Sequence, residues 1–236
     1  MSAMPFDLQL ADLCAALLLL LSFAMLTQRR IVSLVNFLAL QGLLLAVATL
    51  LMAERTGQSH LYVSALLTLV LKALFLPWLL RRLIDRLQVY WDSETLLNVP
   101  AMLLAGVLIV VFAFGLAQPI SALASTATRS SIGIAVAVVL LSFFSMIMRR
   151  KAMSQVVGFL SMENGLFFGA MSATYGMPMM VELGVALDVL VAVLVLGVFF
   201  FQIREQFDSL DLHHLESLRE RNATGPGPGP EPGEDG

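Results

Sequence analysis

The chain has 236 residues, of which 58% are hydrophobic and only 13% are charged, with a formal net charge of −3. Its mean hydropathy of +0.86 excludes an ordinary soluble domain. The apolar residues form continuous runs of about 20 residues, whereas a membrane β-barrel would alternate apolar and polar positions. Lipid cannot hydrogen-bond an open backbone, so we expect an all-α polytopic membrane protein.

The sequence contains few cysteine and histidine residues. Cys14 is the single cysteine, which excludes an internal disulfide. The three histidines lie outside the apolar runs, so neither a metal cluster nor a haem site is expected within the membrane. Because the chain also lacks a phosphate-binding loop and a nucleophile motif, no autonomous active site is expected.

Seven apolar runs in chain order predict seven membrane-spanning helices. They lie at about 7–27, 31–53, 61–80, 98–117, 131–148, 153–174 and 179–203. The first run has no basic start and no small-residue cleavage site after it, so it is expected to be a retained helix.

Three polar segments accompany these helices. Residues 81–97 are too polar to span and are expected to form a helix at the cytoplasmic interface. Residues 204–223 form a charged cytoplasmic tail, and residues 224–236 are rich in glycine and proline and expected to be disordered.

The basic residues predict the orientation in the membrane. Of the fourteen lysines and arginines, eleven fall in the loops after the first, third and fifth helices and in the tail. Arg55 and Arg129 fall on the other side, and Lys72 lies inside the third helix. The positive-inside rule then places the N-terminus outside and the C-terminus in the cytoplasm, in the inner cell membrane.

The sequence also suggests an internal repeat. Residues 1–80 and 131–203 are predicted to be two three-helix copies joined by residues 81–130, which contain the interfacial segment and the fourth helix. Leu21-Ser-Phe23 matches Leu141-Ser-Phe143, and Arg29-Arg30 matches Arg149-Arg150. An insertion of two residues then sets Gln41 opposite Glu163, and a separate match of 71–74 with 187–190 sets Lys72 opposite Asp188. A single joining helix gives both copies the same orientation, so the repeat is expected to be parallel. The alternative is chance similarity between leucine-rich helices.

Four polar residues lie near the centres of these predicted helices, namely Gln41, Lys72, Glu163 and Asp188. Each is about ten residues from a helix end, roughly 15 Å deep and close to the midplane of the bilayer. A charge at that depth costs at least about 2.5 kcal/mol, so such residues mark an ion or proton path by default.

We interpret Glu163 as a protonatable relay with Asn164 beside it as a hydrogen-bonding partner. Asp188 and Lys72 are expected to form either a structural ion pair or a switch in which proton arrival at Asp188 releases Lys72. Gln41 is at most a polar step in a path. Glu182, near the outer end of its helix, is either an interfacial residue or an exit group.

Four segments of the chain resemble the hydrogenase-4 component E family. They are VVGFLSMENG at 156–165, VELGVALDVLVAVLV at 181–195, LVLKALFLP at 69–77 and the charged segment 207–220. The last three predicted helices are also similar to the K-type subunit of respiratory complex I, which carries a glutamate in each of two adjacent helices. Asp188 falls at the position of the second of these glutamates, and Glu163 lies about one helical turn after the first.

This resemblance implies a non-redox membrane subunit of an energy-converting hydrogenase or formate hydrogenlyase complex. Its partners would be antiporter-like and anchor membrane subunits, and indirectly the hydrogenase large and small subunits. The nickel–iron centre and the iron–sulfur clusters would belong to those partners, with no cofactor in this chain and no nucleic-acid partner. A subunit of a cation/proton antiporter and a purely structural membrane subunit remain the alternatives.

Overall fold

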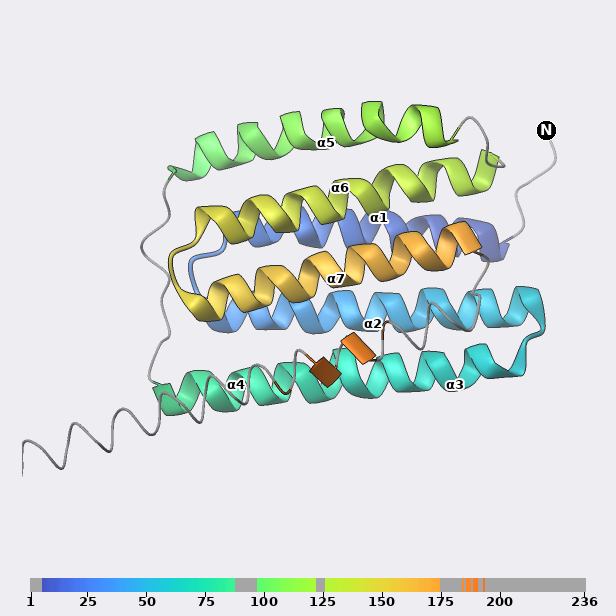
Figure 1. Cartoon of the computed structure of the whole chain (residues 1–236), viewed down its shortest axis with the longest axis horizontal. Coiled ribbons are helices and arrows are strands. Elements are labelled where there is room, and N and C mark those ends of the chain that lie inside the picture. The colour runs from blue at the N-terminus through green and yellow to red at the C-terminus, as the bar shows by residue number, and fades with distance from the viewer. Residues whose placement is uncertain are drawn as a thin grey trace, which may run out of the picture. The chain divides into compact units, whose positions relative to one another are not determined.

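The computed structural model describes residues 6–87, 97–121 and 126–174, together with positions 184, 186, 187, 189, 190 and 193. The helices named below all belong to one unit, Met1–Ala192. In chain order they are α1 (Phe6–Thr27), α2 (Ile31–Thr56), α3 (Ser59–Thr68), the π-helix η1 (Leu69–Phe75), α4 (Leu76–Leu87), α5 (Val99–Ser121), α6 (Thr126–Met148) and α7 (Ala152–Thr174) (Figure 1).

Six helices in the described residues are long and apolar enough to span a membrane, with α3, η1 and α4 together forming the third. This confirms the prediction of an all-α polytopic membrane protein and six of the predicted spans. The seventh predicted span, at 179–203, lies largely outside the described residues, as do the tail segments. The repeat and the division into domains stay predictions.

The third helix is longer than the sequence analysis expected. It continues without a break to Leu87, so residues 81–87 belong to this helix and not to a separate interfacial segment. The reason is an apolar stripe that persists at helical spacing: Leu80, Leu83 and Ile84 are buried while Arg82 faces outward.

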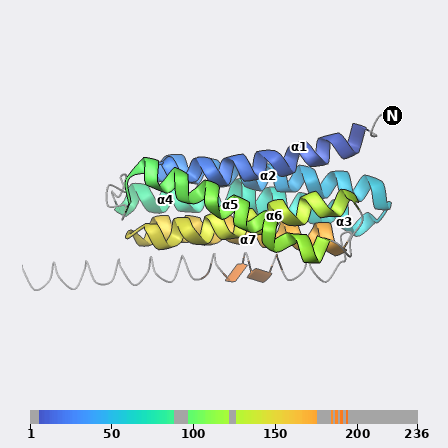
Figure 2. The ribbon, with the colours of Figure 1, turned by 90° about the horizontal axis from the view of Figure 1, so that it is seen from above.

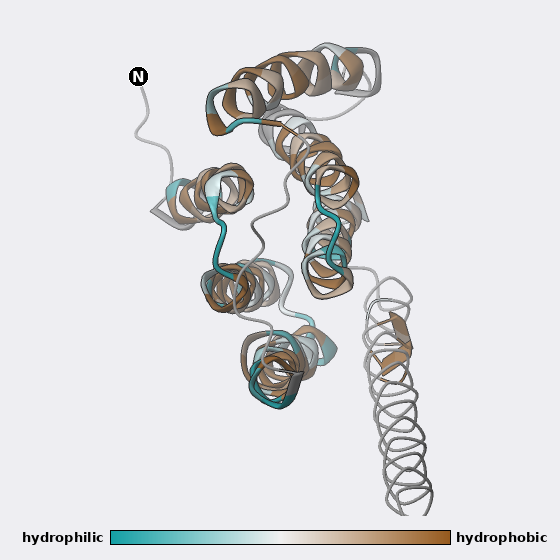
Figure 3. Ribbon diagram, turned by 90° about the vertical axis from the view of Figure 1, so that its left-hand side faces the viewer, coloured by the Kyte–Doolittle hydropathy of each residue, from teal (hydrophilic) through white to brown (hydrophobic). Residues whose placement is uncertain are grey.

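The helices run side by side, and successive helices are antiparallel (Figures 1 and 2). Helices far apart in the chain are also neighbours, since α1 lies beside α6 and α2 beside α7. The α1–α2 loop, the α6–α7 loop and the end of α4 lie at one end, at the left of Figure 1, and the α2–α3 loop lies at the other. Figure 3 faces the first end and shows its hydrophilic loops. We call it the arginine-rich end, because Arg29 and Arg30, Arg81, Arg82 and Arg86, and Arg149 and Arg150 gather there.

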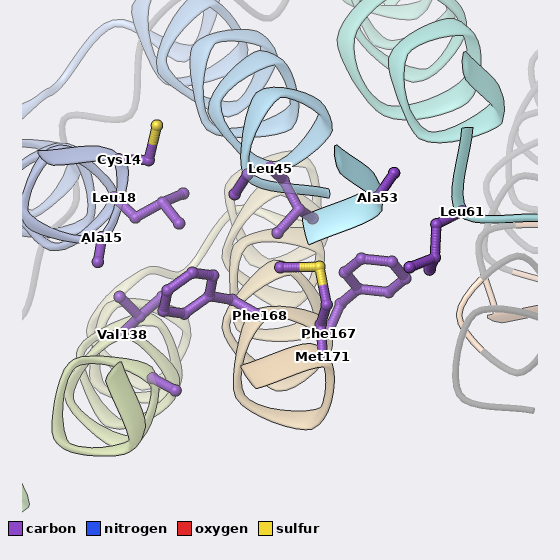
Figure 4. Packing of buried hydrophobic residues seen from close by; sticks show 12 residues of the cluster. Cys14, Ala15, Leu18, Leu45, Ala53, Leu61, Val138, Phe167, Phe168 and Met171 are labelled. Atoms are coloured by element: carbon purple, nitrogen blue, oxygen red, sulfur yellow. The ribbon is translucent and has the colours of Figure 1, made fainter. Parts of the chain in front are cut away.

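The core lies among α1, α2, α6 and α7. Leu18 of α1 and Leu45 of α2 belong to the same buried cluster as Phe167, Phe168 and Met171 of α7 (Figure 4). The helices α5 and α3 lie at the edges of this group and expose large apolar side chains, including Val63, Leu66, Leu104, Val111 and Phe112. Such faces suit contact with lipid.

Candidate functional site

Lys72 is held on a π-helical turn. The backbone N–H of Leu76 donates to the carbonyl of Leu71, five residues back, instead of four as in an α-helix. Pro77 follows and has no N–H, so it cannot donate the next bond of this series, which would reach the carbonyl of Lys72. The π-helix extends over the seven residues Leu69–Phe75 and ends just before this proline.

The Lys72 ammonium is enclosed by three residues of α7. Its Nζ lies 2.6 Å from Oε1 of Glu163, and both side chains are only 3% exposed. It also donates a hydrogen bond of 3.1 Å to Oδ1 of Asn164. The ring centroid of Phe167 lies 5.4 Å from Nζ, within the range of a cation–π interaction. A buried ion pair with hydrogen-bonding neighbours therefore joins the third helix to α7.

Gly42 allows α2 to pack directly against the backbone that carries Lys72. A Cβ placed on Gly42 would lie 2.8 Å from both the carbonyl carbon and the carbonyl oxygen of Lys72, and 3.0 Å from the nitrogen of Ala73. These contacts are with backbone, which cannot rotate away. Gly42 therefore fixes how closely α2 approaches η1 at the level of the ion pair.

Gln41 takes part in a different polar contact, between α1 and α2. Its side chain is fully buried, and its Nε2 donates to Oγ of Ser22 at 2.8 Å. Ser22 in turn donates to the carbonyl of Leu18 at 3.0 Å. Between α6 and α7, Oγ of Ser142 and Oγ of Ser161 lie 2.8 Å apart in a second buried pair. In both pairs the two residues are 19 positions apart in the chain.

Arg149, which the sequence analysis counted only as a loop charge, is 1% exposed. Its Nη2 donates to the carbonyl of Met25 at 2.6 Å and to that of Gln28 at 2.9 Å, and its Nε donates to Oγ of Ser145 at 3.2 Å. It therefore caps the C-terminal end of α1 from the α6–α7 loop. A positive group there also suits the helix dipole.

Three of the predicted site residues meet in the structure: Lys72, Glu163 and Asn164. Gln41 bonds to Ser22 instead. Asp188 and Glu182 lie outside the described residues, and so does the predicted pairing of Lys72 with Asp188. The described partner of Lys72 is Glu163, which the sequence analysis treated separately. Within the described ranges, no group of three His, Cys, Asp or Glu side chains is arranged to hold a metal ion.

The arrangement offers one protonatable acid and one protonatable base in direct contact, away from both ends of their helices. A proton can pass between a carboxyl and an amine at this separation without large side-chain movement. Neutralising either partner leaves the other charge buried, which is unfavourable. The two side chains therefore stabilise each other as a charged pair.

Comparison with known proteins identifies relatives. The chain is 37% identical to the uncharacterized protein Rv0085 of Mycobacterium tuberculosis over 212 residues, which cover 89% of this chain and 96% of the relative. It is 29% identical to hydrogenase-4 component E of Escherichia coli and of Shigella flexneri over 122 residues, 51% of this chain and 56% of those proteins. No protein-family model matches the chain. No solved structure matches it significantly.

Proposed function

Because the chain belongs to the same family as the Mycobacterium tuberculosis protein Rv0085, we propose that it is a proton-transferring membrane subunit of a hydrogenase-4-like complex. The observation that carries the proposal is the buried contact between Lys72 and Glu163. The partial similarity to hydrogenase-4 component E supports the type of complex. Redox chemistry would then take place in partner subunits that hold the nickel–iron centre and the iron–sulfur clusters.

The relay in this proposal consists of Glu163, Lys72 and Asp188, with Asn164, Gln41 and Glu182 as secondary residues. Glu163 accepts a proton from one side and becomes neutral, which weakens its hold on the Lys72 ammonium. Lys72 then releases a proton toward the other side. The Glu163 proton passes to the neutral amine, and this restores the ion pair with one proton moved.

The orientation follows from the charges. With the arginine-rich end in the cytoplasm of a cell-membrane protein, the N-terminus and the α2–α3 loop face outward. Antiporter-like and anchor subunits of the same complex would be its neighbours, and lipid would cover the rest of its apolar surface.

The experiment replaces Glu163 with Gln in the assembled complex and measures proton translocation and hydrogenase activity separately. We expect translocation to fall roughly 100-fold or more, because the acid–base group is lost. Hydrogen oxidation with an artificial acceptor should persist. Glu54→Gln, at an exposed position of α2, is the matched control and should leave both activities unchanged.

Assembly of the single variant is a separate concern, since it leaves Lys72 buried without its carboxylate. The double variant Lys72→Met/Glu163→Gln removes both charges and keeps the side-chain volumes similar, so it should assemble. It must also lose proton translocation. Normal translocation in an assembled variant of either kind would refute the relay.

The purely structural alternative gives a different result. A lower yield of complex with unchanged translocation per complex would support it. The antiporter alternative is distinguished by the neighbouring genes: hydrogenase large and small subunit genes support the proposal, and antiporter-type genes alone oppose it.

A further inference from the structure

An exposed contact joins α2 to α4 near the arginine-rich end. Nη2 of Arg81 donates a hydrogen bond of 2.6 Å to Oδ1 of Asn36, and both residues are exposed. Asn36 follows the first residue of α2, Ile31, by five positions, so the contact lies roughly 8 Å along the helix from its start. This depth is close to the boundary between the lipid headgroups and the hydrocarbon of a bilayer.

The next arginine of α4 is held by an aromatic ring. The guanidinium carbon of Arg82 lies 5.4 Å from the ring centroid of Trp78, one helical turn away, in a cation–π interaction. The Trp78 side chain is 54% exposed, and tryptophan is enriched at the level of the lipid headgroups. Two successive guanidinium groups, of Arg81 and Arg82, are therefore held by other side chains at the edge of the bilayer.

Exposed apolar side chains continue from these contacts toward the membrane centre. On α2, Leu40 and Leu43 follow Asn36 at helical spacing and are exposed. On the third helix, Leu74 precedes Trp78 by four residues and is also exposed. Because α2 and the third helix lie side by side and antiparallel (Figure 1), both apolar stripes begin near the arginine-rich end and run inward from it.

We propose that this surface binds one anionic phospholipid, such as phosphatidylglycerol, in the leaflet at the arginine-rich end. The lipid phosphate accepts hydrogen bonds from the guanidinium groups of Arg81 and Arg82. The acyl chains lie along Leu40, Leu43 and Leu74. Because the lipid touches both helices, it stabilises the packing of α2 against the third helix.

The arginines select the headgroup. A guanidinium carries five N–H donors, and Asn36 accepts from one nitrogen of Arg81, so donors remain for phosphate oxygens, to which arginine binds in a bidentate manner. The helix α4 contains three arginines and one acidic residue, Asp85, and is therefore positively charged. A phosphatidylcholine headgroup carries its own cation and has no net charge, so it offsets this charge less well than phosphatidylglycerol does.

The leucines favour a lipid over an acidic partner protein. They extend from the arginines into the depth of the hydrocarbon, where the carboxylates of a soluble acidic partner cannot follow. A phospholipid combines the negative charge that the arginines require with the apolar chains that the leucines require.

The fluorescence of Trp78 reports the lipid that lies beside it. The chain has two tryptophans, so Trp91→Phe leaves Trp78 as the single one. The full chain is reconstituted in nanodiscs with equal amounts of phosphatidylglycerol and phosphatidylcholine, of which only one carries brominated acyl chains that quench tryptophan on contact. We expect quenching to give a preference of roughly tenfold or more for phosphatidylglycerol, because each arginine near a membrane surface contributes about fivefold.

Two double variants separate this surface from the general positive charge of the arginine-rich end. Arg81→Gln/Arg82→Gln should lower the preference to about one. Arg150→Gln/Lys151→Gln removes two positive charges at the same end, in the α6–α7 loop, and should keep the preference. Equal quenching by both lipids in the Trp91→Phe protein would overturn the inference, and so would the same loss of preference in both double variants.

Native mass spectrometry of the full chain without substitutions provides a second readout, which does not depend on how the variants fold. Protein released from nanodiscs of both lipids should retain phosphatidylglycerol in preference to phosphatidylcholine, and retention of both alike would contradict the proposal. Glycerol phosphate in solution has the headgroup chemistry without acyl chains and should not displace the lipid; displacement would overturn the assignment to a lipid in favour of a free phosphate. None of these measurements involves proton transfer, so the lipid surface and the proposed function fail separately.

Discussion

The energetic coupling between Lys72 and Glu163 can be measured with a double-mutant cycle. The variants are Lys72→Met, Glu163→Gln and the two combined. Each single change leaves one charge in a site that is only about 3% exposed. Breaking a buried pair in this way typically costs about 3–5 kcal/mol, whereas replacing both partners together is often nearly neutral.

The 2.6 Å contact sets the scale of the attraction. With an effective dielectric constant of about 20, Coulomb's law gives about 6 kcal/mol at this separation. Desolvation of both groups and the remaining hydrogen bond to Asn164 reduce the net value. We therefore expect the double variant to be more stable than either single variant.

Reversible unfolding in bicelles, titrated with sodium dodecyl sulfate and followed by circular dichroism, provides the free energies. Ser22→Ala combined with Ser142→Ala serves as a control, because the two serines belong to separate polar pairs and their effects should add. The reasoning about the ion pair is wrong if the losses for Lys72 and Glu163 also add to within about 0.5 kcal/mol.

Two further substitutions test the packing around the site. Gly42→Ala places a methyl group 2.8 Å from the Lys72 backbone and should destabilise the protein by about 1–3 kcal/mol in the same assay. Gly115→Ala is the control, because the space around Gly115 is open, and it should not destabilise the protein. Equal effects of the two variants would contradict the close approach of α2. Arg149→Ala removes two hydrogen bonds to the end of α1 and should lower the free energy of unfolding by about 2–3 kcal/mol. Arg150→Ala, at an exposed position, should lower it by less than about 1 kcal/mol. A smaller loss of stability for Arg149→Ala than for Arg150→Ala would refute the cap.

The spans were predictable because lipid allows few alternatives. Continuous apolar runs must form helices there, and the prediction of 31–53 corresponds to Ile31–Thr56. The end of the third helix was less predictable, since arginines at 81 and 82 suggested that it stops. The amphipathic spacing of Leu83 and Ile84 was the signal that it continues.

The partner of Lys72 was not predictable in the same way. Position along a helix gives depth, and Glu163 and Asp188 have the same predicted depth, but the sequence analysis paired Lys72 with Asp188 alone. Depth does not reveal which helices are neighbours or which faces they present, and that depends on the close contact at Gly42 and on the π-helical turn. The burial of Arg149 could not be predicted either, because it requires the α6–α7 loop to lie beside the end of α1.

The Arg149 cap also has a consequence for biogenesis. Its hydrogen bond to the carbonyl of Met25 joins residues 124 positions apart. At translation rates of about 5–20 residues per second, α1 waits roughly 6–25 seconds for this arginine to be synthesised. Until then the carbonyl of Met25 lacks the arginine and can accept only from the backbone N–H of Gln28, at 3.4 Å, or from water. Insertion of the N-terminal helices and completion of their packing are therefore separate events.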